Sequence, residues 1–240
     1  MGNVQNLPDS LMQQESFTRK EFEIAFSDQY GMTAPQIAYA LKKMLDNGLI
    51  VRKGWGQYSL PKKRRYQHQY SESATAIAEK IMEDYADLNF QIFELIQLND
   101  FMNHQMAHNT IFVTIENELV DFVFESLWKE HPGRVLLRPN ADQYYRYLQD
   151  DEIVVSRLPS EAPKGIDEPW MSRLEKILVD VFTDKLISVI VPDGEKPAII
   201  NGAFEEYMVD EGTMIRYARR KGADQKMKHV LQEYGKVGEA

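Results

Sequence analysis

The strongest constraint on the fold is a series of helix start and stop signals near the beginning of the chain. Thr18 and Glu21 have the spacing of a capping box, which predicts a helix that ends before Gly31. Thr33 is a good N-cap, and Pro35 follows in the first turn of the next helix, where proline loses no helical hydrogen bond. Two helices joined by a short turn are therefore predicted.

The second of these helices covers residues 34–47, is amphipathic, and is followed by a glycine-tipped hairpin. Gly48 supplies a left-handed C-cap. Residues 49–52 and 57–60 then read as two strands joined by the glycine-rich tip 53–56. Helix, short turn, amphipathic helix and hairpin is the order of a winged helix-turn-helix. We therefore predict a winged helix-turn-helix DNA-binding domain over residues 1–62.

Such a domain places its second helix in the major groove, which admits a helix and displays distinguishable base edges. Glutamine can read adenine there, while lysine, arginine and tyrosine hold phosphate or guanine. The candidate DNA contacts are Thr33, Gln36, Tyr39, Lys42 and Lys43 on the helix, Arg52, Lys53 and Trp55 on the hairpin, and Lys62, Lys63, Arg64 and Arg65 after it. Three alternatives stay open: a protein-docking module, a basic tetrad that is only a solvated linker, and a Trp55 that packs against its own hairpin.

The charge distribution divides the chain into a basic and an acidic part. Residues 1–70 carry ten Lys/Arg and six Asp/Glu, a balance of +4, whereas residues 71–240 carry 18 and 31, a balance of −13. A basic head on an acidic body suggests two domains with different partners. The overall charge of −9 does not oppose DNA binding, because affinity depends on the local field at the docking face.

Composition restricts the remaining possibilities. The chain has no cysteine, which excludes disulfides, thiolate metal sites and a cysteine nucleophile. Its apolar runs are far shorter than the roughly 18 residues that a membrane-spanning helix needs. The first ten residues lack the basic start and apolar core of a secretory signal. We expect a cytoplasmic protein that does not contact a membrane.

The rest of the chain reads as a basic linker over residues 63–72 and an α/β domain over residues 73–240. A helix is predicted at 73–87, and strands at 90–96, 110–115, 134–138 and 152–158 alternate with helices at 98–107, 117–130 and 141–148. This alternation predicts a small mixed sheet with flanking helices. A helical C-terminal region follows, with helices at 169–182, 203–209, 214–221 and 225–234. The whole chain is expected to be α+β.

Several short segments of the second domain resemble the antitoxin component of AbiE-type (type IV) toxin–antitoxin systems, the AbiEi-like family. They are residues 98–105, 109–113, 153–155, 161–163 and 174–180. The order of winged helix, α/β unit and helical tail is similar as well. The resemblance implies an antitoxin and repressor that binds an inverted repeat in its own promoter. It also implies a partner, a nucleotidyltransferase-like toxin.

Residues with catalytic or metal-binding chemistry form no convincing site. His104 and His108 share one face of a predicted helix, but no third ligand is placed beside them, and Gln105 breaks the HExxH pattern. The strands that end at Glu116 and begin at Glu152 lack the paired lysine of a nuclease core. Residues 192–196 contain the two acids and the lysine of such a core, but their close spacing indicates a turn. We therefore expect no enzyme activity, no metal and no cofactor.

Two further charged groups are interpreted as ordinary surface. Glu175 and Asp180 lie on an amphipathic helix and are expected to face solvent, with Lys176 at the edge of the buried stripe. A second basic cluster comprises Arg216, Arg219, Arg220 and Lys221. Its partner is expected to be the acidic body, with DNA and an acidic toxin surface as alternatives.

The sequence therefore leaves three candidate functions for the protein. The leading one is an antitoxin and autorepressor, and the second is a winged-helix transcription factor whose α/β domain senses a small ligand. The third is a metal-dependent nuclease or a transferase guided by the winged helix. A pocket with a few converging polar groups would favour the second, and a metal-bound acidic cluster would favour the third.

Overall fold

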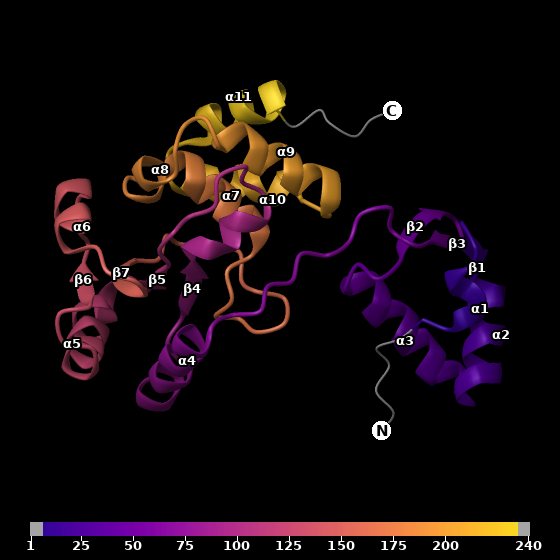
Figure 1. Ribbon diagram of the computed structural model, residues 1–240. Coiled ribbons are helices and arrows are strands. Elements are labelled where there is room, and N and C mark those ends of the chain that lie inside the picture. Colours follow the sequence, from indigo (N-terminus) through magenta and orange to yellow (C-terminus); the bar gives the residue numbers. More distant parts are fainter. Residues whose placement is uncertain (1–6, 235–240) are drawn as a thin grey trace. The chain divides into compact units, whose positions relative to one another are not determined.

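The computed structural model describes residues 7–234, with the side chains of Asp46 and Asn117 outside the description. The chain forms two compact units, Met1–Arg65 and Tyr66–Ala240, called unit 1 and unit 2 here. About half of the residues are helical, and two small sheets complete a mixed α+β protein (Figure 1), which confirms the expected class. Among the described helices, none is both long and apolar enough to cross a membrane.

Unit 1 combines helices with a three-stranded antiparallel sheet of order β1-β3-β2. Its elements are α1 (Asp9–Met12), β1 (Phe17–Thr18), α2 (Arg19–Tyr30), α3 (Ala34–Asp46), β2 (Val51–Gly54) and β3 (Gln57–Ser59). One apolar core joins them, with Phe22 and Phe26 from α2, Met44 from α3 and Tyr58 from β3 all buried. The unit therefore has a core of its own.

The helix signals of unit 1 operate as predicted. The Thr18 backbone N–H donates to Glu21 Oε2 at 2.6 Å, and the Glu21 N–H donates to Thr18 Oγ1 at 3.2 Å, which is the capping box at the start of α2. Gly31 ends this helix in the left-handed region, with φ 62°. Gly48, with φ 66°, follows α3 in the same conformation. The capping box therefore sets where α2 begins, and the two glycines set where α2 and α3 end.

The end of α3 also explains why the following strand begins later than predicted. The Leu49 N–H donates to Met44 O at 2.8 Å and the Gly48 N–H donates to Leu45 O at 3.0 Å, the two bonds of a Schellman motif. Leu49 is therefore occupied by the helix end, and β2 begins at Val51. Strand β1 was not predicted, because two residues are too few to show an alternating pattern.

The first half of unit 2 holds the expected alternation of strands and helices. Its elements are α4 (Glu72–Asp84), β4 (Phe90–Glu94), the 3-10 helix η1 (Leu95–Asp100), β5 (Thr110–Ile115), the 3-10 turn η2 (Asn117–Leu119), α5 (Val120–Glu130), β6 (Val135–Leu137), α6 (Ala141–Tyr147) and β7 (Glu152–Arg157). The sheet order is β4-β5-β7-β6. Strand β4 is antiparallel to β5, whereas β7 is parallel to both β5 and β6, so the sheet is mixed, as predicted.

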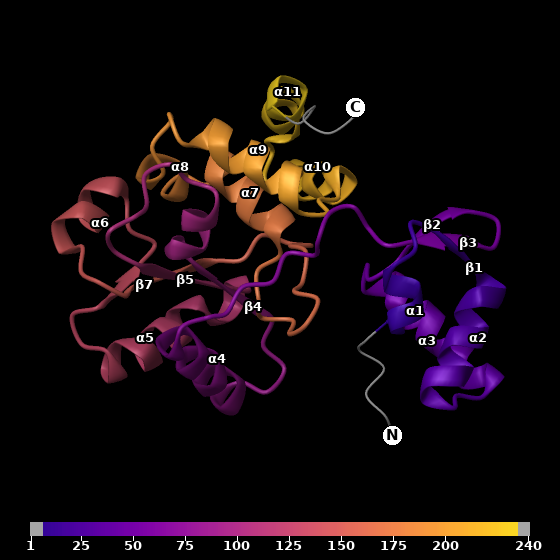
Figure 2. The same ribbon diagram turned by 45° about the vertical axis from the view of Figure 1, so that its right-hand side comes forward.

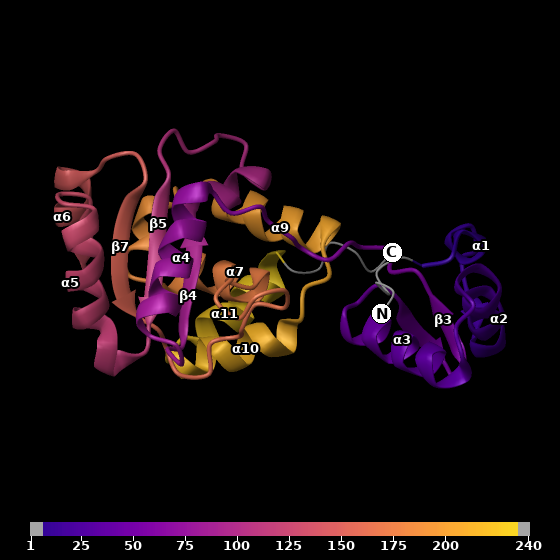
Figure 3. The same ribbon diagram turned by 90° about the horizontal axis from the view of Figure 1, so that it is seen from below.

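Helices cover both faces of this sheet (Figures 2 and 3). Side chains of β5 alternate between the two faces because successive residues of a strand point in opposite directions. Ile111, Val113 and Ile115 pack with α4 and α5 in one apolar cluster. Phe112 packs in the other cluster, with the C-terminal helices. Unit 2 is thus a three-layer arrangement with a core on each side of the sheet.

The C-terminal helices are α7 (Leu174–Thr183), α8 (Ile187–Ile190), α9 (Lys196–Glu206), α10 (Glu211–Arg220) and α11 (Asp224–Tyr234). Helix α7 is buried from Leu174 to Phe182, against the sheet on one side and its neighbours on the other. The C-terminal region is helical, as predicted, but the short helix α8 was not predicted, and the helix expected at 203–209 begins earlier, at Lys196, and ends at Glu206.

Two predicted helices are partly wrong. Residues 98–107 were expected to be helical, but η1 ends at Asp100 and a loop follows, closed by a 2.7 Å hydrogen bond from the Met106 N–H to Asn99 Oδ1. The helix expected at 169–182 begins only at Leu174. The residues before it run beside β4, since the Ile92 N–H donates to Trp170 O at 2.7 Å. A side-chain bond within the loop in the first place, and a bond to β4 in the second, override the local helical pattern.

Part of the segment predicted as a linker packs within unit 2. The Tyr66 ring lies 5.2 Å from the Tyr207 ring, and the Tyr70 ring lies 4.9 Å from the Trp170 ring. The Tyr70 hydroxyl donates to Ile92 O and accepts from the Ser172 N–H, both at 3.0 Å. Alternate residues of this extended stretch thus anchor it to unit 2.

Candidate nucleic-acid interface

Helix α3 carries the central part of the predicted interface. Its apolar side packs into the core of unit 1 through Ile37, Ala40, Leu41 and Met44, all buried. Gln36 and Tyr39 lie three residues apart, so they share the opposite side of the helix. That side is exposed within unit 1: Gln36 is exposed, and Tyr39 is 64% exposed. Lys42 is exposed and Lys43 half-buried on the same side. The amphipathic reading of this helix is therefore confirmed.

The carboxamide of Gln36 has a local role that the sequence reading overlooked. Its Oε1 accepts hydrogen bonds from the Thr33 N–H and the Thr33 hydroxyl, each at 2.9 Å. Thr33 and Gln36 thus form the start of α3 as a cap, through the Thr-x-x-Gln spacing that the sequence already contains. Bidentate reading of adenine needs this same oxygen, so it would require the cap to open.

The hairpin presents cations and one aromatic side chain to solvent. Arg52 and Lys53 are exposed on the edge strand β2, where the pairing with β3 is irregular between Arg52 and Gly54. Trp55 stands at the tip and is 98% exposed. The alternative in which Trp55 packs against its own hairpin is therefore wrong.

Cations dominate the second half of unit 1. Between residues 29 and 65 there are eight Lys/Arg and a single acid, Asp46. Six of these cations have no side-chain hydrogen bond or ion pair with the part of the chain that the structure describes: Lys42, Lys43, Arg52, Lys53, Lys62 and Lys63. By contrast, Arg19 on α2 pairs with Glu23 at 2.9 Å. Within the described part of unit 1, these cations therefore concentrate positive charge on α3, the hairpin and the following segment.

The basic tetrad after the hairpin is not uniform. Lys62 and Arg64 are exposed, whereas Lys63 and Arg65 are half-buried. Both arginines of the tetrad interact with other groups of the protein. Lys62 and Lys63 are therefore the members of the tetrad most available for a ligand.

The other histidine and carboxylate candidates do not form a shared site. His104 and His108 do not lie on a common helix, since their segment is a loop. His104 Nδ1 instead lies 2.6 Å from Glu195 Oε1, which ties this loop to the turn at 192–196. Within the described residues, no three acidic or histidine side chains converge in a way that could hold a metal ion.

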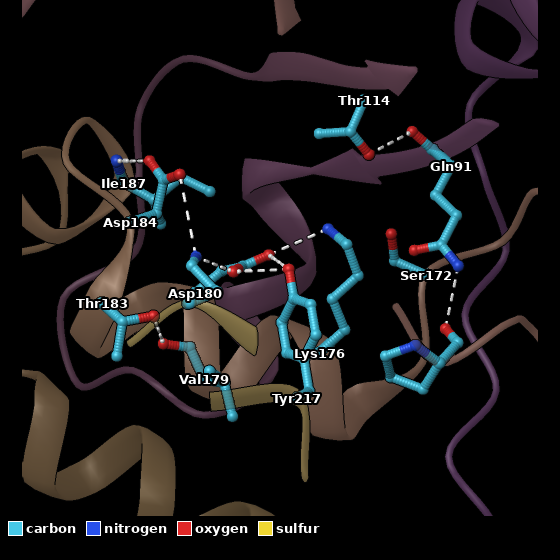
Figure 4. Close-up of polar contacts among 12 residues, drawn as sticks. Gln91, Thr114, Ser172, Lys176, Val179, Asp180, Thr183, Asp184, Ile187 and Tyr217 are labelled. Carbon is cyan, nitrogen blue, oxygen red and sulfur yellow. Dashed lines mark hydrogen bonds and ion pairs between the residues drawn. The ribbon is translucent and has the colours of Figure 1, made fainter. Parts of the chain in front are cut away.

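The interpretation of Glu175 and Asp180 as solvent-facing charges is wrong. Glu175, Lys176 and Asp180 are only 4%, 2% and 4% exposed. In Figure 4 the Asp180 carboxylate accepts from Lys176 Nζ at 2.8 Å and from the Tyr217 hydroxyl at 3.1 Å, and it also pairs with Lys221. Because α7 is packed on all sides, each of its charged residues is buried with a partner, a feature that helical periodicity alone cannot reveal.

The contacts among Asp180, Lys176, Lys221 and Tyr217 shift the pKa values of Asp180 and Tyr217. Burial alone would raise the pKa of Asp180, but the charges of Lys176 and Lys221 outweigh it and hold that pKa below its usual value. Burial and the neighbouring Asp180 raise the pKa of the Tyr217 phenol. Two of the four members of the second basic cluster thus pair with acidic residues, as expected: Lys221 with Asp180, and Arg220 with Glu161.

A family model matches residues 36–236, from the first turn of α3 through the hairpin and unit 2. Its description is "Family of unknown function (DUF6577)". The chain belongs to this family. No curated protein matches the chain. Membership of DUF6577 carries no activity with it, so the function has to be argued from the geometry described above.

Proposed function

We propose that this protein binds double-stranded DNA through unit 1 and acts as a transcriptional regulator. The observation that carries the proposal is the set of six cations on α3, the hairpin and the segment after it that have no side-chain partner among the described residues. DNA phosphates would supply the negative counter-charges for these cations, and the release of counterions from the DNA makes each contact favourable. The exposed face of α3 also suits the major groove, which admits an α-helix.

The arrangement of elements supports assignment of unit 1 as a winged helix-turn-helix. A three-residue turn with Gly31 joins α2 to α3, the connection typical of DNA-binding helix pairs. The β2–β3 hairpin follows α3 directly and forms the wing. In this proposal α3 enters the major groove, Tyr39 and Lys43 face bases or phosphates, and Arg52 and Lys53 hold the backbone.

The resemblance to AbiEi-like antitoxins extends the proposal. On that reading the DNA site is an inverted repeat in the protein's own promoter, and the protein represses its operon. Unit 2 then serves the antitoxic role toward a nucleotidyltransferase-like toxin, in the cytoplasm. The division of charge supports separate roles, since the basic unit suits DNA and the acidic remainder suits a different partner.

The two alternative functions lack a supporting observation. A ligand-sensing regulator needs a pocket with converging polar groups in unit 2, whereas the Asp180 cluster described above satisfies its own groups through Lys176 and Tyr217. A nuclease needs carboxylates that converge on a metal. We therefore keep DNA-binding regulation as the proposed activity.

The proposal is tested by binding of the full chain to duplex DNA from upstream of its own gene. Fluorescence anisotropy with labelled duplex is compared with a scrambled duplex of the same length and composition. We expect tighter binding to the upstream duplex and a linear decline of log K with log salt concentration. Equal and weak binding to both duplexes, without salt dependence, would contradict it.

A further inference from the structure

The tip of the hairpin is built around a single indole. Gly54 pairs with Gln57, so Trp55 and Gly56 form the turn between β2 and β3. Gly56 has φ +69°, the conformation that such a tight turn needs and that glycine adopts freely. A Cβ at Gly54 or Gly56 would meet nothing within 4 Å, so the tip is slim and open on both sides of Trp55.

Exposure of Trp55 is exceptional within this protein. It is 98% exposed, while Trp128 is 50% and Trp170 only 6% exposed. Tryptophan has the largest apolar surface of any side chain, so leaving it in water forfeits a favourable burial. The tip offers no apolar neighbour that would shield it. We therefore expect the Trp55 indole to become buried against a binding partner outside unit 1.

The neighbours of Trp55 decide what that partner is. Arg52 and Lys53 precede it on β2, both exposed and both unpaired within the described chain. Between residues 47 and 65 the sequence contains no acid. The core of a protein–protein interface is depleted of charged residues, lysine among them, whereas here two cations lie shortly before the tryptophan in the chain. Apolar side chains flanked by cations are the means by which proteins enter a base step from the minor groove.

We propose that Trp55 inserts between two stacked base pairs from the minor groove while α3 occupies the adjacent major groove. This inference rests on the proposed DNA binding and adds a bend to it. Arg52 and Lys53 hold the phosphates beside the opened step, and the indole replaces part of the lost stacking. Insertion unstacks a base step and kinks the duplex, so steps that deform easily, such as T-A steps, are preferred.

The test uses the full chain and its Trp55→Ala and Trp55→Phe variants, with Trp128→Phe as the matched control. Because Trp55 contacts only solvent within unit 1, these changes leave the fold intact, which circular dichroism checks. Two duplexes of equal length and composition are compared, one with alternating T-A steps and one with uninterrupted A-tracts. Tryptophan fluorescence reports stacking, and energy transfer between dyes at the duplex ends reports bending.

The expected results separate the indole from the cations. Wild-type and Trp128→Phe fluorescence falls on binding, the duplex bends, and the T-A duplex binds several-fold tighter. Trp55→Ala binds about tenfold more weakly and bends the duplex less. Its salt dependence is unchanged, because an indole releases no counterion.

Two outcomes overturn the insertion alone. One is a Trp55→Ala variant that binds and bends both duplexes as the wild type does. The other is stronger quenching by single-stranded DNA than by duplex, which would mean stacking on unpaired bases instead. If the wild-type chain binds no duplex at all, the proposed function fails together with this inference.

Discussion

Glu152 provides the sharpest test of the energetics of unit 2. It begins β7 opposite Thr110 of β5, is fully buried, and its carboxylate makes no side-chain hydrogen bond with the described residues. Tyr144 of α6 lies nearby, with its hydroxyl engaged at 2.6 Å by Thr110 Oγ1. Burial raises the pKa of Glu152 to about 7, although the charge of Arg134 partly opposes this.

The sign of the effect follows from proton linkage. The folded state holds the Glu152 proton more tightly than the unfolded chain, whose carboxyl has the ordinary pKa of 4.5. The stability contributed by this group is therefore complete below pH 4.5 and is lost as pH rises to about 7. A tenfold change in proton affinity corresponds to about 1.4 kcal/mol, so the loss reaches about 3 kcal/mol above that pH.

Glu152→Gln removes this titration and retains nearly the same shape. We expect the free energy of unfolding of the variant, relative to wild type, to grow by about 2 to 3 kcal/mol between pH 5 and pH 8. Urea denaturation followed by tryptophan fluorescence at several pH values measures it, since Trp170 is buried in unit 2. Glu83→Gln, on the exposed face of α4, is the control and should give a constant difference. A constant difference for Glu152→Gln as well would refute the reasoning.

Two further expectations concern the interior of unit 2. Asp180→Asn leaves Lys176 buried without its counter-charge and leaves Lys221 with the more distant Asp184, at 3.9 Å, so it should lower the free energy of unfolding by about 3 to 5 kcal/mol in urea denaturation at neutral pH. A loss below about 1 kcal/mol would contradict the network. A fragment of residues 66–240 should unfold at higher urea than one of residues 73–240, because only the longer one keeps Tyr66 and Tyr70 on unit 2, and equal midpoints would show that these rings contribute nothing.

Local signals in the sequence were sufficient for the helices and strands that begin with caps. Thr18, Gly31 and Gly48 act on their own neighbours, so their effect is readable without the fold. The strand β5 was equally clear, because its β-branched and aromatic residues favour a strand, and its apolar side chains pack into the clusters on the two faces of the sheet. Elements whose limits depend on distant partners were misjudged. The start of α7 depends on Trp170 bonding to β4, and no local pattern reports that bond.

In the candidate interface, too, features set by local sequence could be predicted, and features set by the folded unit could not. Exposure of Tyr39 and burial of Ile37 follow from helical spacing, and the structure confirms both. The capping role of Gln36 was present in the Thr-x-x-Gln spacing but was read as base recognition. The exposure of Trp55 depends on whether any side chain covers the tip, and that is a property of the folded unit rather than of the residues around it.

The central claim is that the unpaired cations of unit 1 bind phosphates of a duplex. The most direct measurement is the salt dependence of binding to the upstream duplex for the double variant Lys43→Ala, Arg52→Ala. Its control is Lys164→Ala, Lys185→Ala, which removes the same charge from exposed positions of unit 2. We predict weaker binding and a slope of log K against log salt reduced by about 2 for the first variant, with the control unchanged. Identical affinities and slopes for wild type and both variants would contradict the claim.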